Sequence, residues 1–333
     1  GYGCEADAKS STLAAMIPVA LASGSCEIRP ECAVYEISTN DAGRVSEVAY
    51  LDPDGSQRTQ KAKAVIVSAN GAETPRLLLN SANTQFPDGL ANSSGFVGRN
   101  LMYNSHGVVR TVFDQQLNDF KGVQVSRIIH HFYDSDPNRG FYGGGGIDAR
   151  PFRAAEPLNF AVNEPRPGGP SWGAEFKANL EHDFTRTMYL LGSGTSLAQD
   201  SNNITLDPTH KDAWGRPSLR LTYRDHDDDM ALARFLQARA VEVAEAAGAS
   251  EIWAFPVHHQ NNGAHLLGTC RMGDDPATSV VDRYHRSHDI PNLFVCDGSS
   301  FVTSGRGQPT MTIMALAFRA AEHIMDAARR NEI

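Results

Sequence analysis

The spacing of apolar residues predicts that the first part of the chain mixes helix and strand. Apolar side chains recur at helical intervals over residues 6–22, and Gly24 follows as a C-cap. Strand-like segments follow at residues 32–38, 45–51 and 64–68, with Asp/Gly turns between them. We expect a small antiparallel meander that leads into a buried strand at residues 65–67. A glycine-containing turn and a helix at residues 76–80 would follow, as in sheets that present backbone N–H groups to a phosphate or a ring.

The middle of the chain changes to an alternation of polar and apolar residues. This period of two is clear at residues 122–132 and 187–194, and runs of glycine and proline at residues 143–146 and 165–170 interrupt it. The pattern predicts an antiparallel sheet with long loops, which is suited to covering a pocket. A helix over residues 228–247, with aspartates at the end where its dipole favours them, precedes a strand at residues 251–257.

The last part of the chain predicts a strand at residues 293–296 and a long apolar helix that Pro309 opens. The 333 residues suggest about two domains. We therefore expect an α/β fold, in which residues 1–104 and 263–333 form a doubly wound domain. Residues 105–262 would form the antiparallel-sheet domain that binds the substrate.

Composition excludes several classes of function. Charged residues make up 21% and hydrophobic residues 41% of the chain, as in ordinary globular proteins. The net charge of -9 argues against nucleic acid as a partner. No apolar run reaches the roughly 18 residues that a membrane span needs, so we expect a soluble protein. The sequence starts at Gly1 without a signal-peptide pattern, and a cytoplasmic or periplasmic location stays open.

The most specific chemical signal is a histidine that precedes a glycine–threonine turn. His265 stands before Gly268-Thr269, and Gln308-Pro309 begins 43 residues after the histidine. A histidine with a pKa of about 6.5 suits a general base at neutral pH, and small residues after it would let the backbone pass close to a flat cofactor. A core histidine is the alternative. A metal site of His258, His259, His265 and Cys270 is another, but the spacing matches no common zinc pattern and we expect no metal.

Residues 263–324 together resemble the carboxyl-terminal signature of the glucose–methanol–choline (GMC) oxidoreductases, flavoenzymes that move a hydride from an alcohol carbon to FAD. Residues 73–81 and 89–102 are also similar to this family, nearest to its bacterial sugar-dehydrogenase and pyranose-oxidase branches. The resemblance implies that His265 takes the proton of a sugar or other alcohol while flavin N5 takes the hydride. Gln308 stands where the family generally carries Asn or His. It would hold the substrate oxygen, since its amide can donate but cannot act as a base.

The resemblance also assigns the contacts with FAD to separate segments. The strand at residues 293–296 ends against the ribityl–phosphate part, and the backbone at residues 33 and 34 meets the adenine. The helix after Gln308 would point its positive end at the isoalloxazine pyrimidine ring, where reduction adds negative charge. The candidate cofactor-binding residues are Ala33, Val34, Asn70, Asp297, Gly298, Pro309 and Thr310.

One departure from the family is large. Its Gly-x-Gly-x-x-Gly motif, which binds the ADP part of FAD, is not in this sequence, and the glycines at 143–146 lack the strand–turn–helix context. We therefore expect this chain to be the carboxyl-terminal portion of an enzyme whose amino-terminal portion lies in the same or a separate chain. Two alternatives stay open: a flavin-containing lyase on the same fold, or a non-catalytic half of an assembly. The sequence does not discriminate among oxygen, a quinone or a cytochrome as electron acceptor.

Overall fold

The structure is a computed structural model and describes residues 10–121, 125, 127–151, 157–163, 165–260, 263 and 265–333. The helices are α1 (Thr12–Ala15), α2 (Ile17–Ala22), α3 (Asn70–Asn80), α4 (Pro157–Asn163), α5 (Gly173–Phe184), α6 (Asp227–Ala246) and α7 (Thr310–Arg329), with short 3-10 turns η1 (Asp119–Lys121), η2 (Pro137–Arg139) and η3 (Gly298–Ser300). The strands are β1 (Ala33–Thr39), β2 (Val45–Leu51), β3 (Gln57–Lys61), β4 (Val65–Val67), β5 (His106–Val112), β6 (Arg127–Ile129), β7 (Gly145–Arg150), β8 (Thr187–Gly194), β9 (Asn203–Lys211), β10 (Pro217–Thr222), β11 (Glu251–Ala254) and β12 (Leu293–Val295).

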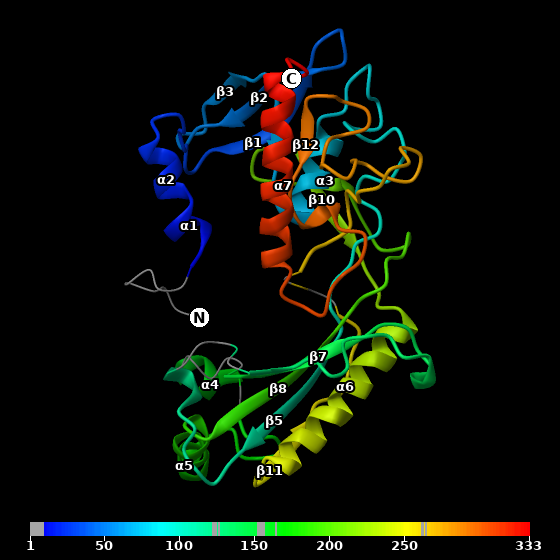
Figure 1. Cartoon of the computed structure of the whole chain (residues 1–333). Coiled ribbons are helices and arrows are strands. Elements are labelled where there is room, and N and C mark those ends of the chain that lie inside the picture. Colours follow the sequence, from blue (N-terminus) through cyan, green and yellow to red (C-terminus); the bar gives the residue numbers. More distant parts are fainter. Residues whose placement is uncertain are drawn as a thin grey trace.

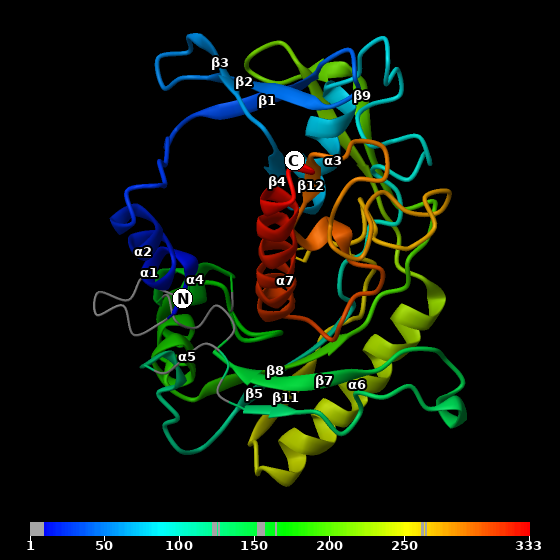
Figure 2. The same ribbon diagram turned by 45° about the horizontal axis from the view of Figure 1, so that its top comes forward.

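The elements gather into two groups, which Figures 1 and 2 show from two directions. One group holds the meander β1–β2–β3, the parallel pair β4–β12 and helices α3 and α7. The other is an antiparallel sheet in the order β11-β5-β8-β7-β6, with α6 along one face. The N-terminal end of α7 points toward this sheet (Figure 1). The predicted α/β fold class, with an antiparallel sheet beside a partial doubly wound unit, is confirmed.

The first sheet corrects the predicted strand assignment. Its third strand is β3, which pairs with β2 and whose residues are all exposed and polar, so they give no alternating signal. The segment predicted as the third strand forms β4 instead, which pairs in parallel with β12. That strand is not fully buried, because the Ile66 side chain is 53% exposed.

Helix α3 begins earlier than expected, and Pro75 explains both the error and its consequence. The prediction started the helix near this proline, but the structure starts it at Asn70 and places Pro75 inside. Proline has no N–H for the carbonyl four residues before it, which is that of Gly71. The buried Thr269 hydroxyl donates to this Gly71 oxygen at 2.7 Å. The Gly-Thr turn after His265 thus provides the hydrogen bond that Pro75 cannot give to the Gly71 carbonyl.

Glycines let α6 pack tightly on the antiparallel sheet. A Cβ at Gly107 of β5 would lie 2.4 Å from the Ala233 carbonyl of α6, and one at Gly192 of β8 would lie 2.6 Å from Cβ of Leu236. The predicted strand at residues 187–194 is confirmed as β8, and α6 matches its prediction within one residue at each end. The alternation at residues 122–132 lies partly outside the described residues.

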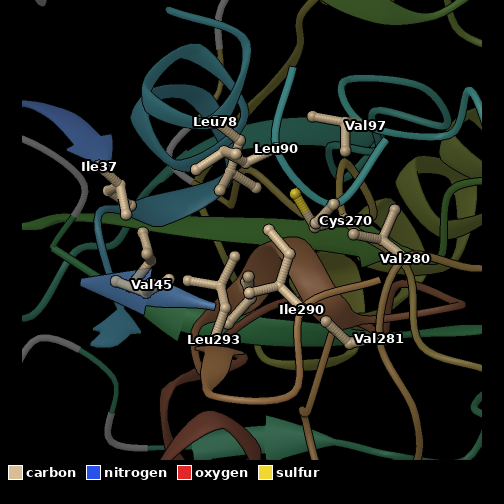
Figure 3. Packing of buried hydrophobic residues seen from close by; sticks show 13 residues of the cluster. Ile37, Val45, Leu78, Leu90, Val97, Cys270, Val280, Val281, Ile290 and Leu293 are labelled. Carbon is tan, nitrogen blue, oxygen red and sulfur yellow. The ribbon is translucent and has the colours of Figure 1, made fainter. Parts of the chain in front are cut away.

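A hydrophobic cluster fills the first group of elements (Figure 3). It joins side chains from β1, β2, α3 and β12 with side chains from the long loops before and after the antiparallel sheet. Its buried members are Ile37, Val45, Val67, Leu78, Leu90, Ala91, Val97, Cys270, Val280, Val281, Ile290, Leu293 and Val295. The loop that follows His265 is therefore anchored in this core, at Cys270.

Two further segments differ from the simple sequence pattern. The hairpin β9–β10 packs on α3, and Asn203 bridges to Arg99, although the predicted boundaries assign this hairpin to the substrate part. The predicted helix over residues 6–22 begins outside the described residues, and its described part is divided at Met16, before Pro18, into α1 and α2. Among the described residues, the helices lack the combination of length and hydropathy that a membrane crossing requires.

Candidate active site

One face of the antiparallel sheet carries polar side chains directed away from α6. Successive residues of a strand face opposite sides, so the residues next to the α6-facing glycines point to the other side. Ser193 of β8 pairs with His106 on one neighbour and with Gly146 on the other. Two residues along β7, Asp148 follows Gly146 on the same face, and Arg150 follows Asp148. This face lies opposite the loop that precedes α7.

A buried carboxylate, Asp148, is the centre of this polar face. Its side chain is fully buried and accepts hydrogen bonds from Arg150 Nη2 at 2.6 Å, from Gln308 Nε2 at 3.0 Å and from Arg306 Nη2. Buried charges require paired and hydrogen-bonded partners. The Arg306 side chain packs on the sheet at Gly146, where an added Cβ would lie 2.4 Å from Arg306 Nε. The sheet and the loop before α7 are therefore joined by the Arg306–Asp148 ion pair and by the hydrogen bond from Gln308 to Asp148.

Gln308 is held by both of its amide ends. Arg306 Nη1 donates to its Oε1 at 2.9 Å, and its Nε2 donates to Asp148. Because a guanidinium only donates and a carboxylate only accepts, these partners fix which end of the amide is which. One N–H of Gln308 remains available to another acceptor. The residue itself is exposed, so this N–H is accessible from outside the cluster.

His265 is half-buried and its Nδ1 is hydrogen-bonded to Asn104 Oδ1. Burial, followed by the positive charge of Arg150, lowers the pKa of His265 below its ordinary value. Burial, Arg150 and His265 itself lower the pKa of His106 to about 4. Both imidazoles are consequently neutral at pH 7, and His265 is in the protonation state that a general base needs.

Backbone pairing with the segment before β5 positions His265. Leu267 and Met102 form an antiparallel bridge in which the two N–H···O distances are 3.0 and 3.2 Å. Gly268 has a φ of +91°, and a Cβ there would lie 2.2 Å from the Asn100 carbonyl oxygen. The close neighbours of Gly268 and Thr269 are thus Asn100 and Gly71 of this chain, and the approach of their backbone to a cofactor stays a prediction.

Asn104 brings the two predicted catalytic segments together. Its Nδ2 donates to the Gly305 carbonyl at 2.8 Å, three residues before Gln308, while its Oδ1 bonds His265. Sequence reasoning found His265 and Gln308 but missed the residues that bond to them, which are Asn104, Asp148 and Arg306. It also missed His106 and Arg150, which interact electrostatically with His265. One signal was present in the sequence. Asp148 and Arg150 stand two apart directly after a glycine run, and charges on the same face of a strand are unusual unless paired.

The proposed adenine contacts lie apart from this cluster. Ala33 and Val34 belong to β1, an edge strand, and line a pocket of about 290 Å³ together with Arg76, Trp214 and other residues of α3 and the β9–β10 turn. The Val34 side chain is half exposed. An edge strand next to a pocket has backbone groups available to a ligand.

Asp297 joins the β4–α3 turn to the end of β12. Its Oδ2 accepts from the Asn70 N–H at 3.0 Å and from the Thr74 hydroxyl at 2.6 Å, and its Oδ1 accepts from the Ser299 N–H at 2.8 Å. Asn70 has a positive φ of 70°. A Cβ at Gly298 would lie 2.7 Å from Leu267 Cδ2. The structure thus brings Asn70, Asp297 and Gly298 together, and the carboxylate already has protein donors.

The N-terminal end of α7 offers a site for a group with negative charge. Pro309 is the N-cap, no side chain caps the helix, and the first-turn residue Thr310 is exposed. The end opens on a pocket of about 510 Å³ lined by Gln308, Pro309, Thr312 and the loop at residues 130–134. Uncapped N–H groups and the helix dipole favour an anionic partner. This matches what a flavin pyrimidine ring needs.

The described part of the chain also contains buried polar atoms at this face that have no hydrogen-bond partner. These are Nδ1 of His106, Nε of Arg150 and Nε of Arg306. Buried donors and acceptors are nearly always satisfied in native proteins. Their position around His265 and Gln308 fits a face that receives a polar ligand.

Two residues of the alternative metal site, His259 and Cys270, lie in different surroundings. Cys270 belongs to the hydrophobic core, where burial raises the pKa of its thiol. His259 Nδ1 lies 3.5 Å from Asp225 Oδ2. Within the described ranges, no three potential metal ligands come together.

The chain matches the two models of the GMC oxidoreductase family, over residues 1–106 and 198–317. It is 39% identical to 2-methyl-1,2-propanediol dehydrogenase of Mycolicibacterium austroafricanum over 92% of this chain and 55% of that protein. It is 33% identical to the fructose dehydrogenase large subunit of Gluconobacter japonicus, over 90% of this chain and 54% of that protein. A crystal structure of formate oxidase superposes with a TM-score of 0.63 at 16% identity, over 91% of this chain and 61% of that one. At this level of identity, the match to formate oxidase shows a shared fold alone.

The fold and these matches place the chain in a class of oxidoreductases. The chain belongs to the GMC oxidoreductase family. It spans about half the length of the curated relatives it matches, 55% and 54% for the two named above.

Proposed function

We propose that the protein oxidises an alcohol carbon of a small polyol or sugar, with His265 as the general base. The observation that carries this proposal is that Asn104 bonds both His265 and the Gly305 carbonyl, three residues before Gln308, whose amide keeps one N–H that Asp148 does not use. When bound, FAD would accept the hydride. Relatives that act on 2-methyl-1,2-propanediol and fructose support a hydroxylated small molecule as the substrate class.

His265 would remove the hydroxyl proton of the substrate. Its lowered pKa keeps the imidazole unprotonated at neutral pH, and Asn104 occupies its Nδ1. Gln308 would donate its remaining N–H to the substrate oxygen as negative charge develops there. The uncapped end of α7, with Pro309 and Thr310, would hold the pyrimidine side of the flavin. Asn70, Asp297 and Gly298 would shape the part of the site near the ribityl chain, and Ala33 and Val34 the adenine end.

A substrate panel under anaerobic conditions tests this function. We expect polyols or sugars to bleach the flavin absorbance of the whole protein without added electron acceptor. A flavin-containing lyase would convert its substrate without bleaching, and a non-catalytic half would show neither reaction. Failure of every alcohol to reduce the flavin would contradict the proposal.

After burial, Arg150 is the second factor that lowers the pKa of His265 and so affects the pH at which it becomes a base. We expect Arg150→Gln to move the rising limb of the rate–pH profile to higher pH. Arg150 lowers the pKa of His265, so removing its charge raises that pKa, and protonated His265 is inactive over a wider acid range. The same direction follows from Asp148, which would lose one of its two cations. Arg150→Lys keeps a charge and should leave the limb near its original position; an unshifted limb in Arg150→Gln would contradict this role.

We also propose that the amino-terminal portion of the enzyme, in the same or a separate chain, covers the apolar stripe of α7. Met311, Phe318 and Met325 follow each other at intervals of seven and are 75%, 58% and 51% exposed. Such a stripe on one helix face normally packs against a partner. The relatives are long enough to contain a segment that could cover this stripe, since close to half of each lies outside the matched region.

Hydrogen exchange tests whether another part of the protein covers α7. We expect amides of α7 around Phe318 to exchange more slowly in the whole protein than in the isolated 333-residue chain. Amides of α6, whose core side already packs on the sheet, should change little and serve as the control. Equal protection of α7 in both samples would argue against this covering.

A further inference from the structure

We infer that Asn104 is a positioning residue that holds His265 with its proton on Nδ1 and a free electron pair on Nε2. This inference rests on the proposed function of His265 as a base. It adds which nitrogen takes the proton and which residue decides it. The basis is the set of hydrogen bonds that surround one buried amide.

The orientation of the Asn104 amide is determined by its neighbours. The side chain is almost completely buried, and its Nδ2 donates to the carbonyl oxygens of Gly194 at 3.1 Å and Gly305 at 2.8 Å. Carbonyl oxygens only accept, so an inverted amide would place Oδ1 against two other acceptors. The amide oxygen therefore points to His265, and both amide hydrogens are already used.

The tautomer of His265 follows directly. Asn104 Oδ1 can only accept, so the hydrogen of this bond belongs to Nδ1 of His265. A neutral imidazole with its proton on Nδ1 carries its lone pair on Nε2. The atom that receives the substrate proton is consequently Nε2, on the ring edge opposite Asn104.

Asn104 also links the base to the residue that would hold the substrate oxygen. Gly194 ends β8, and Gly305 begins the loop that carries Arg306 and Gln308. The alternative is that Asn104 has a purely structural role and only connects these segments. That alternative makes a different prediction from the positioning role, because the two roles use opposite ends of the same amide.

Two substitutions separate the roles. Asn104→Leu removes the acceptor and both donors, whereas Asn104→Asp, when ionised, keeps an acceptor for His265 and loses the donors to Gly194 and Gly305. If Asn104 only joined segments, both variants would be equally impaired. We expect Asn104→Leu to slow substrate-dependent flavin reduction by about 10–100-fold, by analogy with the loss of a residue that orients a metal-binding histidine. Asn104→Asp should retain most of the rate at high pH.

The Asn104→Asp variant should also show a shifted pH profile. Its new negative charge next to His265 raises the pKa of the imidazole, so the rising limb moves to higher pH. The charged and titratable groups that already face this region are Arg150 and Asp148 of β7, His106 of β5 and Arg306 of the loop before α7. None of them changes in this variant. Ser105→Ala is the matched control, because Ser105 is the adjacent buried residue and its hydroxyl has no partner within the described chain.

Nitrogen-15 NMR of histidine-labelled protein tests the tautomer without any turnover. The His265 signals are those missing from His265→Gln, and we expect them to show a protonated Nδ1 and an unprotonated Nε2 at neutral pH. Ser105→Ala should keep this pattern at neutral pH, and Asn104→Asp should keep it at a pH above the raised pKa of its imidazole. Asn104→Leu should let the Nε2–H form become populated. The wild-type spectrum is decisive even if a variant fails to fold.

The outcomes remain distinguishable from failure of the proposed function. A wild-type His265 protonated on Nε2, or an unchanged tautomer in Asn104→Leu, would overturn the assignment of Asn104. Equal losses in Asn104→Leu and Asn104→Asp, with no pH shift, would mean that Asn104 has a purely structural role. If instead His265→Ala reduced its flavin normally, the base would lie elsewhere while the tautomer assignment still stood on the spectrum.

Discussion

Replacing His265 with alanine should lower the rate of substrate-dependent flavin reduction by about 10²–10⁴-fold, the usual contribution of a general base. His265 is half-buried, neutral at pH 7, and bonded at Nδ1 to a residue that leaves Nε2 free. Rapid mixing with substrate under anaerobic conditions measures the rate directly. Flavin content should remain, because the bonds of Asp297 and the open end of α7 do not involve the histidine.

A matched substitution controls for the loss of an imidazole. His210→Ala removes a histidine of β9 whose side chain is 82% exposed, and it should leave the rate unchanged. His106 is a competitor for the role of base, but its pKa of about 4 makes it a weak one. A near wild-type rate in His265→Ala would show that the base lies elsewhere and that the motif around residue 265 has another purpose.

The elements that could be predicted are those whose ends carry local signals. Helix α6 has a capping box, in which the His226 ring accepts from the Asp228 N–H and Asp229 accepts from the His226 N–H. Pro309 likewise marks the start of α7. Strand β3 could not be predicted, because its exposed polar residues pair with β2 through backbone bonds alone.

Only part of the site could be predicted from the sequence, because several of its residues meet only in the folded chain. His265 and Gln308 lie in a long ordered signature, so their roles could be proposed from the chain itself. Asp148 and Arg306, by contrast, are 158 residues apart and meet because β7 lies opposite the loop before α7. Asn104 gives no local sign of its function, since its partners at residues 194, 265 and 305 are distant in sequence.

Replacing Gln308 with leucine should slow flavin reduction strongly without moving the pH at which the rate rises. Loss of one donor to a developing oxyanion costs about 2.7–4 kcal/mol, or about 10²–10³-fold, and this is an upper bound here because His265 remains. The pH limb should stay, since burial and Arg150 lower the pKa of His265 and Gln308 is not among the causes. Gln60→Leu, the same change at an exposed position of β3, is the control.

The partners of Gln308 allow a sharper form of this test. Asp148 and Arg306 together fix the direction of the amide, so the remaining N–H can face a substrate oxygen only while both are in place. We expect Asp148→Asn and Gln308→Leu to be non-additive in a double-mutant cycle on the flavin-reduction rate, with a coupling of about 0.5–3 kcal/mol for residues in one hydrogen-bond network. Additive effects would mean that Gln308 is oriented independently of Asp148. A shifted pH limb in Gln308→Leu would mean that the glutamine acts through His265 instead of on the substrate.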